Sequence, residues 1–370
     1  MRSSSRRSQG AACYALSDGI SASISPLSTT MFLACCAAVR LVQLNSSEKE
    51  NFEPSKGAQS KRSSGSKNGV IAFDWGGFDS PGPRDEMEDS WCMISLSRKV
   101  LYFGVFDGHG GSASSTYLKS NLITFIEDAG MKMCDSAANG ELLDEYGVGD
   151  ENPLAQAFEK ADSALIDYLG SLGDPECWSG STATTCFVSR GHIIVANVGD
   201  SRAVLGRKGQ TVDLSGDHRP VGSSKTGRTE ILRVLECGGW VSKMRVCGIL
   251  AVTRAFGDYE FKGGRAELLQ ELVSTGSTRT ETLTRAPIVA IPDVKVYKRS
   301  DEDDFIILAT DGLWDVMNSA QAITFVRTMV KQDSTCSMQD ISSALIERAL
   351  KSRTQDNVSC VVIDIRSMVT

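Results

Sequence analysis

A nearly unbroken apolar run, Val100 to Phe106, stops at the glycine-rich stretch Asp107-Gly108-His109-Gly110-Gly111. A continuous apolar run bounded by such a turn is typical of a strand buried on both faces. A second run, Asp304 to Thr310, leads in the same way to Asp311-Gly312. We therefore predict two buried strands that each deliver an aspartate at their C-terminal end. Taken alone, each Asp-Gly turn fits an inert turn as well as an ion-binding one.

The same patterns predict most other elements. Strands are expected at 71–78, 91–96 and 358–365, and helices at 112–126, 153–170, 226–237, 320–331 and 340–351. Residues 179–215 hold short β-branched runs separated by turns, which predicts an antiparallel meander. Together the elements predict one α+β domain: a four-layer α-β-β-α sandwich, with two antiparallel sheets packed face to face and helices outside.

The ends and one internal stretch differ from this pattern. Residues 1–47 are rich in Arg and Ser and poor in acids, which predicts an organellar transit peptide, with a disordered tail as the alternative. Residues 48–69 read as a linker, residues 70–366 as the folded domain and 367–370 as a tail. The polar stretch 259–285 is expected to form a flap. The apolar piece 31–44 is too short to span a bilayer, so we expect no transmembrane segment.

Composition narrows the classes of function. The net charge is −7 and the pI is near 5.2, which argues against nucleic acid as a partner. Three histidines make a His-rich zinc or iron site improbable. The eleven cysteines form no C-x-x-C pair, which favours reduced thiols over a disulfide framework.

Acidic side chains recur where predicted strands begin or end. Asp107, Asp311 and Asp356 stand at three such positions, and Glu88 and Asp89 adjoin a fourth. Carboxylates gathered without histidine or thiolate partners repel one another unless cations neutralise them. Oxygen-only ligands point to Mg²⁺ or Mn²⁺. Two such ions can share a water, lower its pKa and direct it at phosphorus.

Two further residues fit phosphate chemistry. Arg84 lies beside the acidic cluster and offers a planar bidentate donor for phosphate oxygens. His109 titrates near neutral pH and can protonate a departing alkoxide. The pattern therefore predicts Asp107, His109 and Arg84 as the residues nearest the chemistry.

The chain resembles the metal-dependent type 2C (PPM family) Ser/Thr protein phosphatases. The motifs that carry the resemblance cover about residues 70 to 366 in the order of that family: Arg84…Met87-Glu88-Asp89, Asp107-Gly108-His109-Gly110-Gly111, Gly180-Ser181-Thr182-Ala183, Asn197-Val198-Gly199-Asp200-Ser201-Arg202, Asp217-His218-Arg219-Pro220, Leu250 to Asp258 (LAVTRAFGD), Asp311-Gly312-Leu313-Trp314-Asp315 and Asp356-Asn357. Eight ordered motifs are far beyond accidental matching.

The resemblance implies a dinuclear Mn²⁺ or Mg²⁺ centre at one end of a β-sandwich. It implies that Asp107 bridges the ions, that the Gly108 carbonyl binds one of them, and that Asp311 and Asp356 bind the other. The remaining implied roles are Glu88 and Asp89 for metal-bound waters, Arg84 for the substrate phosphate, His109 as the acid, and Asp200 with Asp315 near a third, weaker ion found in some members.

Other matched residues are expected to be structural. His218 is predicted to be a hydrogen-bonded structural histidine, and Gly180 to Ala183 to pack a turn or the core. Three departures from the family pattern are Arg219 in place of Lys, Thr253 in place of Ser, and Cys247 in place of a polar residue. We expect none of the three to touch a proposed ligand.

The function that this resemblance implies is hydrolysis of phosphoserine or phosphothreonine in a phosphoprotein, by a monomer without a phosphoenzyme. Within the family the chain most resembles the plant thylakoid-associated phosphatase of light-harvesting antenna protein. That protein carries a C-terminal membrane-spanning segment, which we do not expect in this chain. With the leader, this resemblance predicts the chloroplast stroma or the stromal face of the thylakoid, the alternative being cytoplasm or nucleus. Two other functions stay open: a pseudophosphatase that binds phosphoproteins, and a small-molecule phosphohydrolase.

Overall fold

The computed structural model describes residues 74–97, 100–129, 152–172, 176–262 and 283–366, all within one compact unit. The predicted transit peptide, linker and C-terminal tail lie outside these residues, as does most of the predicted flap (263–282). No helix in the described ranges is long and apolar enough to cross a membrane.

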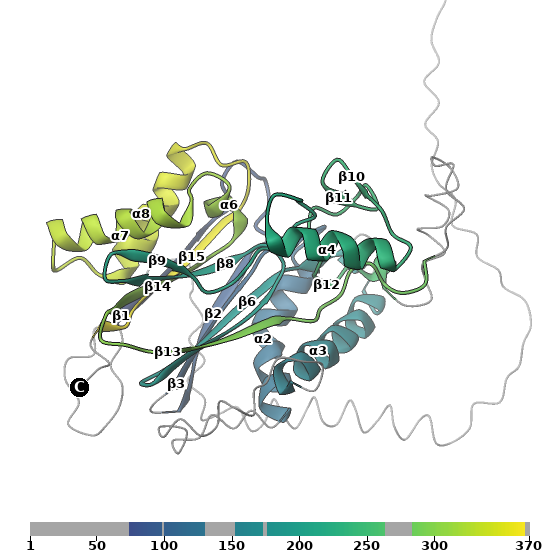
Figure 1. Ribbon diagram of the computed structural model, residues 1–370, viewed down its shortest axis with the longest axis horizontal. Coiled ribbons are helices and arrows are strands. Elements are labelled where there is room, and N and C mark those ends of the chain that lie inside the picture. Colours follow the sequence, from purple (N-terminus) through teal and green to yellow (C-terminus); the bar gives the residue numbers. More distant parts are fainter. Residues whose placement is uncertain (1–73, 98–99, 130–151, 173–175, 263–282, 367–370) are drawn as a thin grey trace, which may run out of the picture. The chain divides into compact units, whose positions relative to one another are not determined.

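Two five-stranded antiparallel sheets form the centre of the domain (Figure 1). The first has the order β13-β7-β6-β3-β2, with β2 at Ser90–Ser97, β3 at Val100–Phe106, β6 at Ala183–Ser189, β7 at His192–Val198 and β13 at Asp293–Lys298. The second has the order β1-β15-β14-β8-β9, with β1 at Asp74–Ser80, β8 at Arg202–Arg207, β9 at Gln210–Asp213, β14 at Asp303–Ala309 and β15 at Val358–Asp364.

Three apolar cores hold four layers together. The inner core lies between the sheets, where Phe103 and Val105 of β3 cluster with Ile306 and Leu308 of β14. Outside the first sheet pack α2 (Ala113–Asp128) and α3 (Pro153–Gly170). Outside the second pack α7 (Ser319–Gln332) and α8 (Met338–Lys351). The predicted four-layer sandwich is therefore confirmed, and burial of these faces is what drives it.

Shorter elements surround one end of the sheets. They are β4 (Gly108–His109), η3 (Glu176–Trp178), β5 (Gly180–Ser181), α4 (Lys225–Glu236), β10 (Val241–Ser242), β11 (Arg245–Val246), β12 (Phe256–Gly257), η4 (Tyr259–Phe261) and α6 (Asp311–Trp314). β4, β5 and β12 pair in a small sheet of their own. The edge strand β13 and the one-turn helix α6 were not predicted. β13 alternates apolar and polar residues at Val294 and Val296, but it is short, and α6 is a single turn.

The predicted meander is wrong in one respect. β6 pairs with β7 and β8 pairs with β9, but the two hairpins belong to different sheets. The chain crosses between the sheets at 199–201, where Gly199 has a φ of +98°. A side chain there would also collide with Thr182, so only glycine fits this crossing. Strand periodicity cannot distinguish such a crossing from a hairpin.

Candidate active site

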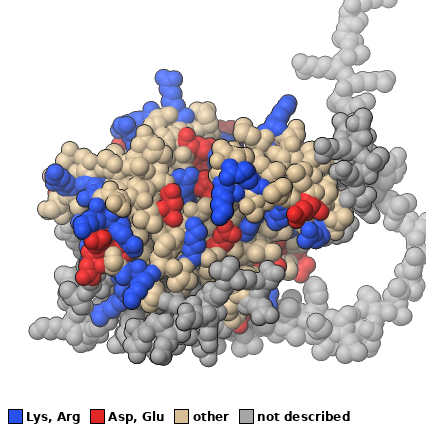
Figure 2. Space-filling model, in the orientation of Figure 1, with Lys and Arg blue, Asp and Glu red and all other residues tan. Residues whose placement is uncertain are grey.

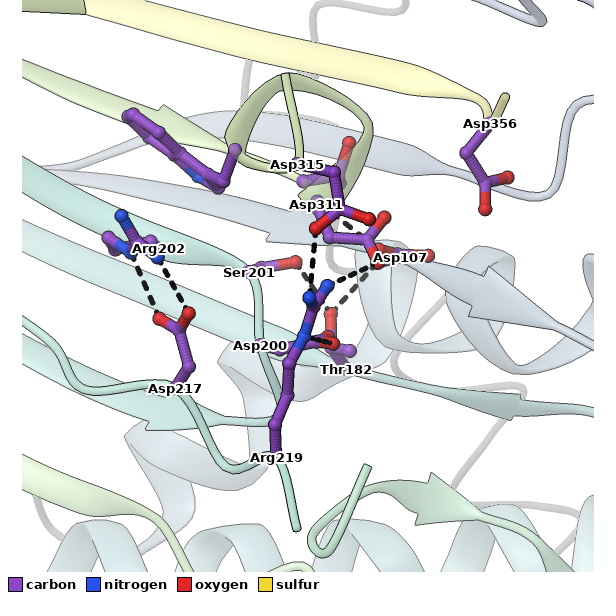
Figure 3. A network of polar contacts seen from close by, with 12 residues as sticks. Asp107, Thr182, Asp200, Ser201, Arg202, Asp217, Arg219, Asp311, Asp315 and Asp356 are labelled. Atoms are coloured by element: carbon purple, nitrogen blue, oxygen red, sulfur yellow. Dashed lines mark hydrogen bonds and ion pairs between the residues drawn. The ribbon is translucent and has the colours of Figure 1, made fainter. Parts of the chain in front are cut away.

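Three aspartates from different elements meet at the end of the sandwich (Figure 3). Asp107 follows β3 of the first sheet, Asp311 opens α6 directly after β14 of the second, and Asp200 lies at the crossing between them. One carboxylate oxygen from each lies within 4.8 Å of the others. Two of the three positions, Asp107 and Asp311, are those predicted from the Asp-Gly turns after buried strands.

Burial and mutual repulsion disturb these carboxyls. The pKa of Asp107 is raised well above its usual value, first by burial and then by the negative charges of Asp311, Asp89 and Asp200. Burial likewise raises the pKa of Asp311, and Asp200 and Asp315 raise it further. A group of acids that resists ionisation in this way calls for positive charge between its members.

The donor set fits a hard divalent cation. The group consists of carboxylate oxygens, which Mg²⁺ and Mn²⁺ prefer, and the neighbouring Gly108 carbonyl can add another oxygen. At Gly108 a Cβ atom would lie 2.3 Å from the Glu88 carbonyl oxygen, so a side chain could not fit here. The site therefore suits a divalent cation, and ligation by Asp107 and Asp311 stays a prediction.

Glu88 and Asp89 lie beside this group. A Glu88 side-chain oxygen accepts a 2.7 Å hydrogen bond from the Gly111 amide, which ties it to the loop after Asp107. Asp89 is buried and accepts a 2.8 Å hydrogen bond from the Thr310 hydroxyl, next to Asp311. Burial raises the pKa of Asp89 to about 7, although that hydrogen bond opposes the shift.

Asp356 and Arg84 form a separate, more exposed part of the site. Arg84 donates at 2.9 Å both to Asp356 and to the Gln355 carbonyl. Asp356 lies apart from the three clustered aspartates in Figure 3, although its charge contributes to the raised pKa of Asp107. Asn357 fixes the loop that carries Arg84, since its amide donates at 2.9 Å to the Pro81 and Glu86 carbonyls.

His109 is held by an aspartate that sequence reasoning did not identify as functional. Its Nε2 lies 2.8 Å from a carboxylate oxygen of Asp258, which is almost fully buried. Burial lowers the pKa of His109, but the charge and hydrogen bond of Asp258 outweigh it and raise the pKa. A Cβ at Gly180 would lie 2.3 Å from that same Nε2, so Gly180 makes room for the imidazole.

Arg219 contradicts the expectation that the departures from the family pattern lie away from the ligands. Its guanidinium contacts Asp200 at 2.5 Å, Asp311 at 2.8 Å and Asp315 at 2.8 Å. The prediction was wrong because a loop residue with a long side chain reaches a site that only the folded chain assembles. His218, by contrast, is a buried structural histidine as predicted, and its Nδ1 accepts from the Gly199 amide at 3.1 Å.

Sequence reasoning therefore missed two residues of the site, Arg219 and Asp258. Asp258 ends the LAVTRAFGD motif, and no role was predicted for it there. In the structure its φ of +50° singles it out, because a non-glycine residue in the left-handed region is uncommon and often marks a functional position. That backbone conformation cannot be read from the sequence.

Comparison with known proteins decides the family. A family model described as Protein phosphatase 2C matches residues 74–358, which contain all of the residues above. The chain belongs to the protein phosphatase 2C family. This protein phosphatase 2C is therefore a protein serine/threonine phosphatase, and the predicted family, fold and enzyme class are confirmed. The family is metal-dependent, in agreement with the group of acidic residues at the site.

Several relatives resemble this protein phosphatase 2C over most of its length. "Protein phosphatase 2C 57" of Arabidopsis thaliana is 37% identical over 80% of this chain and 76% of its own. "Protein phosphatase 2C homolog 3" of Schizosaccharomyces pombe is 33% identical over 76% of this chain and 62% of its own. A crystal structure of serine-threonine phosphatase 2C from Toxoplasma gondii shares the fold, with a TM-score of 0.60 and 24% identity over 79% of this chain and 94% of that one.

Proposed function

We propose that this phosphatase hydrolyses phosphoserine and phosphothreonine directly, with two Mn²⁺ or Mg²⁺ ions held by Asp107, the Gly108 carbonyl, Asp311 and Asp356. The observation that carries the proposal is the convergence of Asp107, Asp200 and Asp311 within 4.8 Å. When bound, the ions supply the Lewis acidity that lowers the pKa of a water for attack on phosphorus. Glu88 and Asp89, which lie beside the same group, would accept hydrogen bonds from such waters.

Arg84 binds the substrate phosphate in this proposal. Its side chain is 55% exposed, and it already pairs with the carboxylate of Asp356 at the edge of the site. A phosphate dianion carries more charge than a carboxylate and presents oxygens at the spacing of the guanidinium fork. The Asn357 hydrogen bonds hold the Arg84 loop in place, which lowers the cost of ordering it on binding.

His109 gives its proton to the departing serine or threonine oxygen. Asp258 holds Nε2, so Nδ1 is the ring nitrogen that can face the substrate. Because Asp258 raises the pKa of His109, the imidazole is more readily protonated near neutral pH. Asp258 itself is a positioning residue that acts through His109.

Metal dependence and ligand variants test this mechanism together. Turnover of a phosphothreonine peptide should require Mn²⁺ or Mg²⁺ and stop on chelation. The Asp311→Asn variant should lose more than about 100-fold in kcat. The matched control is Asp304→Asn, which alters an acid near the start of the same strand, far along β14 from the site, and should keep activity. Unchanged turnover in Asp311→Asn would refute the metal assignment, and preference for sugar phosphates over peptides would favour a small-molecule phosphohydrolase.

We further propose a chloroplast phosphoprotein, with light-harvesting antenna protein as the first candidate, as the substrate. The Arg- and Ser-rich leader and motifs such as DHRPVGSS and ECGGWV support this proposal. Import of the full chain into isolated chloroplasts, followed by fractionation, tests the location. Purified enzyme should then dephosphorylate antenna protein in isolated thylakoids faster than an unrelated phosphoprotein. A chain that stays outside the organelle would refute this substrate and leave the phosphatase mechanism standing.

A further inference from the structure

One guanidinium contacts three carboxylates of the site at once. The Nε atom of Arg219 lies 2.5 Å from Asp200, Nη2 lies 2.8 Å from Asp311, and Nη1 lies 2.8 Å from Asp315. Figure 3 shows the side chain reaching from its loop up into the space between Asp200 and Asp311. Each of the three nitrogens thus serves a different acid, whereas a lysine would have to bring all three acids to a single nitrogen.

The loop beneath Arg219 is fixed by buried hydrogen bonds. The neighbouring His218 is fully buried, and its amide donates to the Gly199 carbonyl at 2.9 Å. The His218 carbonyl accepts from both the amide and the hydroxyl of Thr253, at 2.8 and 3.0 Å. Arg219 therefore extends toward the acids from a backbone that these hydrogen bonds hold in place.

Charge explains why the arginine stays there. The Asp200 side chain is only 4% exposed and that of Asp311 is 21% exposed, so water screens their repulsion poorly. A guanidinium is charged at any physiological pH, so Arg219 offsets this repulsion through its contacts with all three acids.

We propose that Arg219 takes the place of a third cation in this enzyme. Its guanidinium fills the position between Asp200, Asp311 and Asp315, so the chain binds two divalent ions and excludes a third at Asp200 and Asp315. This inference rests on the two-ion centre proposed above. It gives Arg219 a second consequence as well: the charge that it brings stabilises the acids before any ion binds.

Two measurements test the inference without relying on turnover. Equilibrium dialysis against Mn²⁺ counts the ions bound per chain, and thermal unfolding in EDTA reports the metal-free state. Wild type should bind two ions. Arg219→Gln should bind three and unfold at a lower temperature than wild type in EDTA, with the difference reduced in excess Mn²⁺. Arg228→Gln is the matched control, because this arginine is exposed and its guanidinium donates to the backbone carbonyls of Gly222 and Ser223.

A double variant identifies the position of the added ion. Arg219→Gln combined with Asp315→Asn should return to two ions, because the third ion loses a ligand. An Arg219→Gln variant that still binds two ions, or a wild-type chain that binds three, would overturn the inference and leave the proposed function intact. A wild-type chain that binds no Mn²⁺ would overturn the two-ion centre and this inference with it. If Arg219→Gln does not fold, the number of Mn²⁺ ions bound per chain is measured on Arg219→Lys, which is a smaller perturbation.

Discussion

A buried ion pair supports the segment that orients the proton donor. The Lys262 ammonium contacts both carboxylate oxygens of Asp162, at 2.8 and 2.7 Å, and the Ala255 carbonyl at 2.7 Å. Asp162 also accepts from the Gly257 amide at 2.9 Å. Ala255 and Gly257 lie three residues and one residue before Asp258, so the ion pair fixes the backbone that presents Asp258 to the histidine. We predict that Lys262→Met will destabilise the domain strongly.

The magnitude follows from what the substitution leaves behind. Lys262 is 8% exposed and Asp162 is 12% exposed, so methionine fills the space but leaves a carboxylate buried without its cation. Removing one partner of a buried pair costs about 3–5 kcal/mol. With an unfolding entropy of about 2.1 cal/mol/K per residue over roughly 290 residues, that corresponds to a fall in Tm of about 5–8 °C.

The assay is urea unfolding and thermal unfolding of wild type and variants. Asp162→Asn/Lys262→Met should recover at least about 2 kcal/mol of the loss, since asparagine can still accept from the Gly257 amide without an unpaired charge. Lys351→Met is the matched control. It breaks an exposed pair with Glu347 and should change stability by less than about 0.5 kcal/mol.

The pH dependence gives a second test of the same reasoning. Burial already raises the pKa of Asp162 in the presence of Lys262, and removing that ammonium raises it further. A carboxyl whose folded-state pKa is raised destabilises the fold as pH rises through that value. The deficit of Lys262→Met relative to wild type should therefore shrink as pH falls. A variant within about 1 kcal/mol of wild type at pH 8, or a deficit independent of pH, would refute the account.

The remaining predictions concern proton donation, phosphate binding and acid stability. Asp258→Asn should lower kcat by about 10–100-fold with little change in KM, because it acts on the proton transfer alone. Arg84→Ala should lower kcat/KM for a phosphopeptide by about 10–100-fold, chiefly through KM. Asp293 has a pKa of about 2, because hydrogen bonds and charges of His218 and Arg254 outweigh the effect of burial. Relative to Asp293→Asn, wild type should therefore lose stability in urea titrations as pH falls from about 4 to 2, by a small amount since this side chain is 39% exposed.

The sequence was sufficient for the parts of the site that local pattern controls. Asp107 and Asp311 follow buried strands that end in Asp-Gly, and both the strands and their ends are set by residues adjacent in sequence. The helix start at Asn152-Pro153 was predicted for the same reason, and the Asn152 side chain caps the Leu154 amide at 2.9 Å. Local signals of this kind survive folding because tertiary contacts reinforce them.

The sequence could not predict the residues whose place in the site depends on which sheet a strand joins. Asp200 entered only through the family resemblance, because its turn reads as an ordinary hairpin and is in fact a crossing between sheets. Arg219 was expected not to touch a proposed ligand for a related reason. The acids that it contacts, Asp311 and Asp315, lie 92 and 96 residues away in the chain. Spacing along the chain carries no information about such encounters.

The face-to-face packing of the sheets is thus the physical basis of the site. Asp107 leaves one sheet and Asp311 leaves the other, so the distance between them is set by the thickness of the inner core that Phe103 and Leu308 share. Side chains in such a core are close-packed and tolerate little displacement. The strands therefore hold mutually repelling carboxylates near one another at the expense of stability, and Arg219 offsets part of that cost before any metal ion arrives. On the face seen in Figure 2, acidic and basic side chains are likewise interspersed among the described residues.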